Sequence, residues 1–245
     1  MNKKWECIEL DNEKIKNVEK IENEYGISNL LAKILVNRNL IKKEDIDLFL
    51  KPTRHDFHNP YLMPDMALAV DRIIKAINNK EKILIYGDYD VDGITSITVV
   101  KNFLLERGAN VTQYIPNRLN EGYGLNKDAI KKISDDAVNL IITVDCGISG
   151  IEEVDYANSL GLEVIVTDHH EVGEVLPNAI AVVDAKRKDS TYPFRELAGV
   201  GVGFKLIQAI AQRLELEEKE YLKYLDIVCI GTISDIVPLV DENRV

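Results

Sequence analysis

The residues of this 245-residue sequence best suited to chemistry are three carboxylates at alternate positions. Asp88, Asp90 and Asp92 follow the aliphatic run 83–86 and precede Gly93. Each pair of like charges about 4 Å apart costs roughly 4 kcal/mol at an effective dielectric constant near 20. A sequence that keeps three such groups together is therefore expected to bind a cation.

An acidic triplet of this kind also occurs in calcium loops and in solvated turns. The calcium loop of an EF-hand needs a Glu at its twelfth position, and counting from Asp88 that position is Val99. The triplet also follows a strand-like run, whereas an EF-hand loop follows a helix. A solvated acidic turn is the second alternative, and it loses weight once the acidic positions elsewhere in the chain are counted.

Two more strand-like runs end in the same kind of residue. The run 140–144 is followed by Asp145, and the run 164–167 is followed by Asp168, His169 and His170. Right-handed crossovers bring the carboxyl ends of parallel strands to one edge of a sheet, where ligands bind. We therefore expect all these side chains to converge in one crevice.

The residue types at this expected crevice select the chemistry. Carboxylates with one or two imidazoles suit Mn²⁺, with Mg²⁺ or Zn²⁺ as alternatives, and the lack of cysteine ligands disfavours structural zinc. Five or six carboxylates are too many for one ion and fit two ions that share a bridging carboxylate. Two such ions can activate a water and stabilise both oxygens of a phosphoryl transfer. The pattern favours hydrolysis of a phosphate ester.

Simple structural roles account for several further polar or glycine-rich positions. Asp145 alone could cap a helix, and Cys146 is expected to be a small buried residue. His55 and His58 lie between prolines, where packing or solvent exposure is favoured over metal binding. The segment 199–203 lacks the glycine spacing of a dinucleotide loop. Its amides could face a phosphate, or its glycines could permit close packing.

The periodicity of apolar residues predicts an α/β fold. Residues 1–60 are expected to form a small helical cap and linker, and residues 61–245 the catalytic domain. In that domain, short apolar runs alternate with helices, which predicts a parallel β-sheet of about five strands with helices on both faces. The expected strands are 83–86, 111–115, 140–144, 164–167 and 180–183. The expected helices are 67–78, 95–107, 127–134, 151–160, 204–214 and 221–230, the last ended by Gly231.

Composition narrows the function classes further. The net charge of −11 argues against a protein that coats nucleic acid through a broad basic surface. The three cysteines, Cys7, Cys146 and Cys229, form no C-x-x-C pair, so neither a disulfide framework nor a zinc site is indicated. No apolar run reaches the length of a membrane helix, and the N-terminus has no signal-like apolar region. We expect a cytoplasmic protein with no membrane partner.

The ordered motifs resemble those of the DHH phosphoesterases over nearly the whole chain. They are the acidic triplet, Val144-Asp145-Cys146-Gly147, Asp168-His169-His170 and the segment 231–239. The variant is similar to the RecJ branch, the bacterial exonucleases that degrade single strands from 5′ to 3′. The segments that carry this second likeness are Asp-Tyr-Asp-Val-Asp-Gly at 88–93, Pro116-Asn117-Arg118, Glu121-Gly122-Tyr123-Gly124 and residues 197–201.

The resemblance implies a role for each site residue. It implies two groups of metal ligands that share Asp145: Asp88 and Asp90 in one group, and Asp92, His169 and Asp235 in the other. It places His170 at the scissile phosphate, Asp168 behind the site as a support, and Arg118 on the DNA backbone. Lys186, Arg187, Lys188 and Arg195 are weaker candidates for a basic track, with a solvated loop as the alternative. The Asn-Pro usual before that loop is Asp184-Ala185 here.

The resemblance also implies substrate, metal and partners. The expected activity is hydrolysis of single-stranded DNA from the 5′ end, in DNA repair and recombination, with two divalent cations, Mn²⁺ or Mg²⁺. A single-strand-binding protein and a RecQ-type helicase are expected partners. The alternatives are a DHH hydrolase of short oligonucleotides or cyclic dinucleotides, and a metal-free DNA-binding scaffold. The chain stops soon after the fourth motif, so we expect a fragment that carries the metal centre without the later domains.

Overall fold

The computed structural model describes residues 8–245, so Cys7 and the residues before it lie outside the described part. The chain separates into two compact units. One ends at Asp56 and also includes Arg244 and Val245, and the other is Phe57–Asn243. The predicted division at residue 60 stays a prediction. Within residues 8–245, every helix is too short or too polar to cross a membrane.

Within its described residues, the first unit contains three helices, which agrees with the helical character predicted for the N-terminal segment. They are α1 (Asn12–Tyr25), α2 (Asn29–Asn37) and α3 (Lys43–Leu50). The Asp11 side chain caps α1 by accepting from the amide of Lys14, and α1 ends at Gly26 in the left-handed conformation that glycine tolerates. Val18, Leu35 and Ile46 belong to a small buried core of its own.

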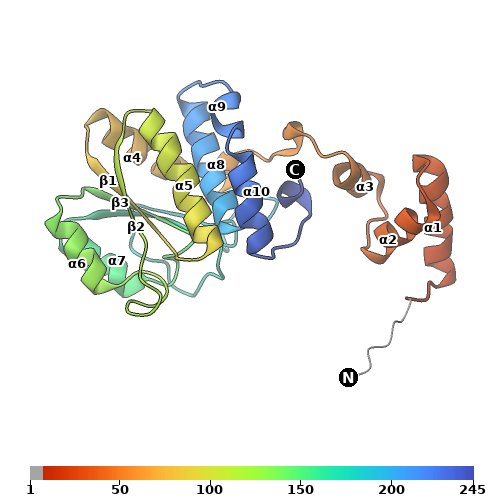
Figure 1. Ribbon diagram of the computed structural model, residues 1–245, viewed down its shortest axis with the longest axis horizontal. Helices are drawn as coiled ribbons and strands as arrows, with labels where there is room; N and C mark the ends of the chain where they lie inside the picture. Colours follow the sequence, from red (N-terminus) through yellow and green to blue (C-terminus); the bar gives the residue numbers. More distant parts are fainter. Residues whose placement is uncertain (1–7) are drawn as a thin grey trace. The chain divides into compact units, whose positions relative to one another are not determined.

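The second unit is built on a sheet of five parallel strands in the order β2-β1-β3-β4-β5 (Figure 1). The strands are β1 (Lys82–Gly87), β2 (Asn110–Tyr114), β3 (Leu140–Val144), β4 (Glu163–Thr167) and β5 (Ala181–Val183). This confirms the predicted fold class. The three strands that the sequence associates with acidic residues, β1, β3 and β4, lie side by side in the middle of the sheet.

Helices cover both faces of this sheet. Successive side chains of a strand point to opposite faces, so each strand contributes to two cores. Ile83 and Ile85 pack into a core with the helices 66–78, 91–106 and 199–213, while Leu84 and Tyr86 pack into a second core with the helices 127–135 and 151–159. The helices of this unit are α4 (Met66–Asn78), α5 (Val91–Glu106), α6 (Lys127–Asp135), α7 (Ile151–Ser159), α8 (Gly199–Arg213), α9 (Lys219–Leu222) and α10 (Leu225–Ser234).

Three of the predicted helix boundaries are wrong, and each correction bears on the site. Helix α5 begins at Val91, four residues earlier than predicted, because the Asp90 side chain caps it by accepting from the amide of Gly93. Helix α8 begins at Gly199 rather than Phe204. The expected helix 221–230 is two helices, α9 and α10, and α10 continues past Gly231.

The glycine within α10 has a packing role instead of ending the helix. A Cβ atom at Gly231 would lie 2.8 Å from the Val200 side chain and 3.1 Å from an Asp92 carboxylate oxygen. Real Cβ atoms essentially never come closer than 3.0 Å to such a neighbour. Glycine therefore lets α10 approach α5 and α8, which brings the end of α10, and Asp235 with it, to the sheet edge.

Candidate metal centre and active site

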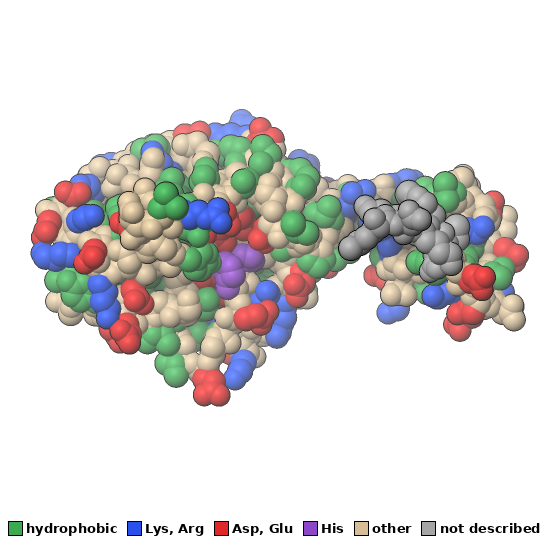
Figure 2. Space-filling model, turned by 60° about the horizontal axis from the view of Figure 1, so that its bottom comes forward, with side chains coloured by type: hydrophobic (Ala, Val, Ile, Leu, Met, Phe, Trp, Pro, Cys, Tyr) green, Lys and Arg blue, Asp and Glu red, His purple; other side chains and the backbone are tan. Residues whose placement is uncertain are grey.

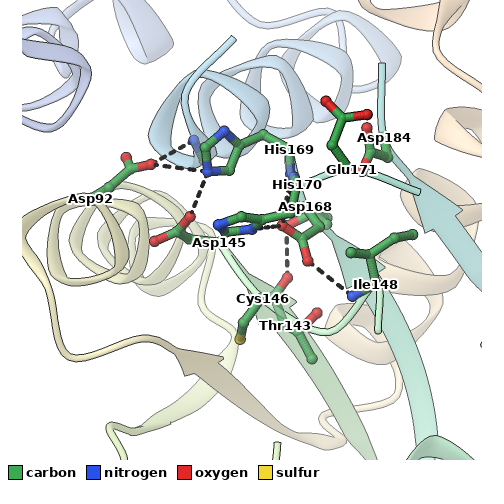
Figure 3. Close-up of polar contacts among 12 residues, drawn as sticks. Asp92, Thr143, Asp145, Cys146, Ile148, Asp168, His169, His170, Glu171 and Asp184 are labelled. Atoms are coloured by element: carbon green, nitrogen blue, oxygen red, sulfur yellow. Dashed lines mark hydrogen bonds and ion pairs between the residues drawn. The ribbon is translucent and has the colours of Figure 1, made fainter. Parts of the chain in front are cut away.

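The register of the sheet aligns the acidic strand ends. Gly87 of β1 pairs with Val144 of β3, and Val144 pairs with Thr167 of β4. The next residue of each strand is therefore level with the others: Asp88, Asp145 and Asp168. The convergence predicted from the strand ends is present, and Figure 3 shows Asp145, Asp168 and the histidines at this edge.

Asp145 has a backbone conformation that is unusual for a residue with a side chain. Its φ is +58°, in the left-handed region, directly after the last residue of β3. Such a conformation costs of the order of 1–3 kcal/mol for residues other than glycine, and it is concentrated at functional sites. The residue is also only 2% exposed. The fold thus holds a strained, buried acid at the centre of the edge.

His169 lies among three carboxylates from three different elements. Its Nε2 is 3.0 Å from an Asp145 oxygen and 3.7 Å from an Asp92 oxygen, and its Nδ1 is 3.7 Å from an Asp235 oxygen. Asp92 comes from the first turn of α5 and Asp235 from the end of α10. The structure therefore brings together the four residues that the resemblance assigns to the second metal group.

Asp92 is fixed by the first turn of α8. The amides of Gly199 and Val200 donate to its two carboxylate oxygens at 2.6 and 2.8 Å. The partial positive charge of a helix N-terminus favours an acid at this point. A Cβ atom on Gly199 would lie 2.5 Å from an Asp145 oxygen, so only glycine fits there. The glycine-rich segment thus faces protein carboxylates, a contact that the sequence analysis missed.

Asp88 and Asp90 differ in their surroundings. Asp88 is buried, and its Oδ1 has no hydrogen-bond partner. Asp90 is exposed and accepts from the amide of Gly93 with one oxygen. Burial raises the pKa of the Asp88 carboxyl, and the negative charge of Asp90 adds to that effect. Asp90 also raises the pKa of Asp145, so the three acids share one electrostatic cluster.

Asp92, Asp145 and Asp235 have raised pKa values, because burial and neighbouring carboxylates disfavour their ionised forms. Burial raises the pKa of Asp145 to about 10, with further contributions from Asp92, Asp90 and Asp168. Burial likewise raises the pKa of Asp92 and of Asp235. A divalent cation among these oxygens would reverse the effect, because it stabilises the ionised form.

The residues present fit a pair of divalent cations. Asp88 Oδ1 is buried without a hydrogen-bond partner, and His169 Nε2 lies 3.0 Å from an Asp145 oxygen without forming a hydrogen bond of good geometry. The surrounding ligands are carboxylate oxygens with one imidazole, a set that suits Mn²⁺ or Mg²⁺. Two overlapping groups of side chains have ligand atoms within 4.8 Å of one another: Asp92 with His169 and Asp235, and Asp145 with Asp168, His169 and His170.

Asp168 is saturated by hydrogen bonds and supports the histidines. One oxygen accepts from the amide of Ile148 at 2.9 Å, and the other accepts from the amide of His169 at 2.7 Å and is 2.7 Å from His170 Nδ1 (Figure 3). Burial alone would raise the pKa of Asp168, but the His170 ring and the amides outweigh it and lower that pKa. The same hydrogen bond raises the pKa of His170. This geometry gives Asp168 a supporting position behind His170.

The basic candidates separate into different surroundings. Arg118 is exposed, and its guanidinium lies over the Tyr89 ring, 5.2 Å from the centroid, beside the acidic triplet. Lys186 is half-buried and pairs with Glu171 at 3.1 Å, and Arg195 is exposed. In Figure 2 the histidines line the floor of a hollow with acidic and basic side chains at its rim.

Arg187 is a correction to the predicted basic track. Arg187 is 6% exposed, and its guanidinium binds the Asp65 and Asp189 carboxylates and the carbonyl oxygen of Val182. A guanidinium with these partners joins the loop after β5 to the start of α4. We therefore leave Arg187 out of the candidate substrate contacts.

Comparison with known proteins agrees with this geometry. The model of the DHH family, N-terminal domain, matches residues 82–232, which is more than half of the chain and contains every strand of the sheet. The chain belongs to the DHH family.

Among curated DHH relatives, the single-stranded-DNA-specific exonuclease RecJ of Bacillus subtilis is 46% identical over 98% of this chain and 30% of its own length. A crystal structure of exonuclease RecJ bound to manganese has a TM-score of 0.68 at 36% identity, covering 74% of this chain and 46% of that one. RecJ of Thermus thermophilus in complex with Mn²⁺ has a TM-score of 0.74 at 29% identity, covering 94% and 32%. The chain thus spans about a third of the length of the curated relatives that it matches.

Proposed function

We propose that this chain carries the metal centre of an exonuclease that hydrolyses phosphodiester bonds of single-stranded DNA from the 5′ end. The observation that carries the proposal is the position of Asp145, a strained and buried carboxylate 3.0 Å from His169. Asp92 of α5 and Asp235 at the end of α10 lie 3.7 Å from His169, and the charge of Asp90 acts on Asp145. The relatives named RecJ support the choice of single-stranded DNA as substrate.

The proposed ligands form two groups that meet at Asp145. Asp88 and Asp90 would complete one group, and Asp92, His169 and Asp235 the other. When bound, Mn²⁺ or Mg²⁺ ions would supply an activated water and neutralise charge on the phosphate. The chain itself supplies the rigid placement, because the α8 amides hold Asp92 and the left-handed turn holds Asp145.

His170 and Arg118 are the proposed contacts to the scissile phosphate. His170 is part-exposed at the hollow, and Asp168 holds its Nδ1, which leaves Nε2 on the other side of the ring. A raised pKa favours the imidazolium, which donates to a phosphate oxygen. The Arg118 guanidinium can pair with the same group in bidentate fashion. Lys186 and Arg195 would extend the contact along the DNA backbone.

The wider setting follows the same proposal. We infer a cytoplasmic role in DNA repair and recombination, with a single-strand-binding protein and a RecQ-type helicase as partners. The metal-free scaffold has no support from the site, because every acid and imidazole of the proposed ligand groups is present. Short oligonucleotides and cyclic dinucleotides remain as the competing substrate class.

The test compares wild-type protein with Asp145→Ala in the presence of Mn²⁺. Asp145→Ala should lower the hydrolysis of a single-stranded oligonucleotide by at least about a thousandfold, because both ligand groups lose their shared carboxylate. Asp135→Ala is the matched control, since that exposed acid pairs with Lys131 on the surface of α6. Wild-type activity in Asp145→Ala would refute the shared ligand.

A second assay separates the substrate classes. Long single strands, dinucleotides and cyclic dinucleotides are digested side by side, and the products are resolved by chromatography. Faster release of mononucleotides from the 5′ end of the long strand is the expected result. Preferential cleavage of the short or cyclic substrates would contradict the proposal.

A further inference from the structure

Tyr123 contacts the candidate active site although the proposed function gives it no part. Its hydroxyl oxygen is 3.2 Å from Nε2 and 3.3 Å from Nδ1 of His170, and it donates to the backbone carbonyl of Asp145 at 3.4 Å. The two rings meet edge to face with centroids 5.8 Å apart. One side chain thus touches both the phosphate-facing histidine and the strained turn.

The loop that carries Tyr123 is braced from within. The Glu121 carboxylate accepts from the Tyr114 hydroxyl at 2.5 Å and from the amide of Asn117 at 2.6 Å. The Tyr86 hydroxyl, which comes from the buried β1 strand, donates to the carbonyl of Gly124 at 3.0 Å. These bonds anchor both sides of Tyr123 to the sheet.

The glycines on either side of Tyr123 serve the backbone. Gly122 and Gly124 have φ of +77° and +79°, and a Cβ atom at either position would meet nothing within 4 Å. There is room for a side chain at both positions, so glycine is favoured there because of the left-handed backbone conformation and not because of crowding. Each part of the Glu-Gly-Tyr-Gly motif therefore has a physical role: Glu121 ties the loop, two glycines turn it, and Tyr123 reaches the site.

His170 is held from two sides as a result. Asp168 binds its Nδ1 at 2.7 Å, and the Tyr123 hydroxyl reaches Nε2. The hydroxyl donates its single proton to the Asp145 carbonyl, so its oxygen can accept from the protonated His170 ring. Burial, with Asp168 and Asp145 nearby, raises the pKa of Tyr123, so the hydroxyl stays a neutral donor.

We propose that Tyr123 is a positioning residue that fixes the His170 ring against Asp168 and so orients Nε2 toward the scissile phosphate. This inference rests on the proposed function of His170. It extends the role of the loop 117–124 from carrying Arg118 to holding the histidine.

The kinetic test is a double-mutant cycle with Tyr123→Phe and His170→Ala, assayed on a single-stranded oligonucleotide with Mn²⁺. Tyr123→Phe keeps the ring and should lower kcat about tenfold with little change in KM, the rate equivalent of one hydrogen bond. In the His170→Ala background the same change should have no further effect. Equal losses in both backgrounds would overturn the proposal.

A control variant tests whether the loss of any hydrogen-bonded tyrosine hydroxyl lowers kcat, and an NMR measurement tests the positioning role without an activity assay. Tyr61→Phe also removes one hydroxyl, which donates to the carbonyl of Ala209 at 2.8 Å, and kcat should not change. The ¹⁵N resonances of His170 are recorded in chelator, where no hydrolysis is needed. Tyr123→Phe should shift the Nε2 resonance and Tyr61→Phe should not. An unshifted resonance refutes the positioning role, even if the chain proves to cleave another substrate.

Discussion

The unit Phe57–Asn243 buries acidic side chains in two regions, and the two regions balance their charge differently. In one, Glu242 is 6% exposed and pairs at 2.7 Å with Lys205, which is 1% exposed. The amide of His58 and the hydroxyl of Tyr192 also donate to Glu242. This cluster, Lys205–Glu242 with Tyr192 and His58, supplies its own cation.

The metal centre supplies no such cation. Within residues 8–245, Asp88, Asp92 and Asp145 form no ion pair with a lysine or arginine, and the basic group in contact with Asp92 and Asp145 is the imidazole of His169. The same protein therefore buries a neutralised acid at one place and unneutralised acids at another. The difference indicates that the second region is built to receive cations from solution.

Removing the carboxylate from the Lys205–Glu242 cluster should have the largest effect on stability. Glu242→Gln should lower the free energy of unfolding by about 3–5 kcal/mol, because it leaves the buried Lys205 ammonium without its counter-charge. Urea denaturation measures the change. Lys131→Gln, which breaks an exposed pair with Asp135, is the control and should cost under about 1 kcal/mol. An equally small loss in Glu242→Gln would remove the contrast between the two regions.

Divalent metal should stabilise the protein through the metal centre and not through the Lys205–Glu242 cluster. A divalent cation that binds only the folded protein adds about 2.7 kcal/mol at a concentration one hundred times its Kd. Mn²⁺ should therefore raise the thermal midpoint of the wild type, and Asp145→Ala should abolish that rise. Glu242→Gln should retain it, although from a lower starting midpoint. A Mn²⁺-dependent rise that survives in Asp145→Ala would contradict the assignment of this ligand.

In chelator, Asp145→Asn should stabilise the protein by about 1–2 kcal/mol at neutral pH, because folding of the wild type must protonate an acid that is ionised in the unfolded chain. The pKa of Asp145 is raised in the folded protein to about 10, above an unfolded value of about 3.9. Its contribution to stability is thus fully present below the unfolded pKa and is lost as pH rises through the folded pKa. The advantage of Asp145→Asn should therefore grow between about pH 5 and 9. A constant difference over this range would show that Asp145 does not titrate in this way.

The smallest expected effects concern two adjacent basic residues, Lys186 and Arg187, of which the first should affect DNA binding and the second stability. Lys186→Ala should leave stability nearly unchanged and reduce the salt dependence of single-strand binding by about one phosphate contact. Arg187→Met should instead lower stability, because Asp65 and Asp189 lose their shared guanidinium. Fluorescence anisotropy across a salt series and urea denaturation distinguish the two. Equal salt slopes for wild type and Lys186→Ala would remove Lys186 from the DNA track.

The strands and the acids at their ends could be predicted from sequence, because a buried parallel strand is a short apolar run and its end is an abrupt polar residue. Asp88, Asp145 and His169 were found in this way. Helix starts were harder to predict. The glycines of α8 gave no apolar periodicity, so the amides that bind Asp92 were missed.

Further parts of the site depend on contacts between distant segments. Gly231 resembles a helix end in sequence, and only its approach to Val200 and Asp92 explains why α10 continues. Asp235 follows a helix, so the family resemblance indicated it where pattern alone did not. Arg187 looked like part of a basic run, and its partner Asp65 is more than a hundred positions away in the chain.

Anomalous scattering from crystals soaked in Mn²⁺ tests the two-metal centre most directly. We predict two peaks about 3.5–4 Å apart, with the Asp145 carboxylate between them, Asp88 and Asp90 beside one peak, and Asp92, His169 and Asp235 beside the other. A single peak, or two peaks that do not share Asp145, would contradict the central claim.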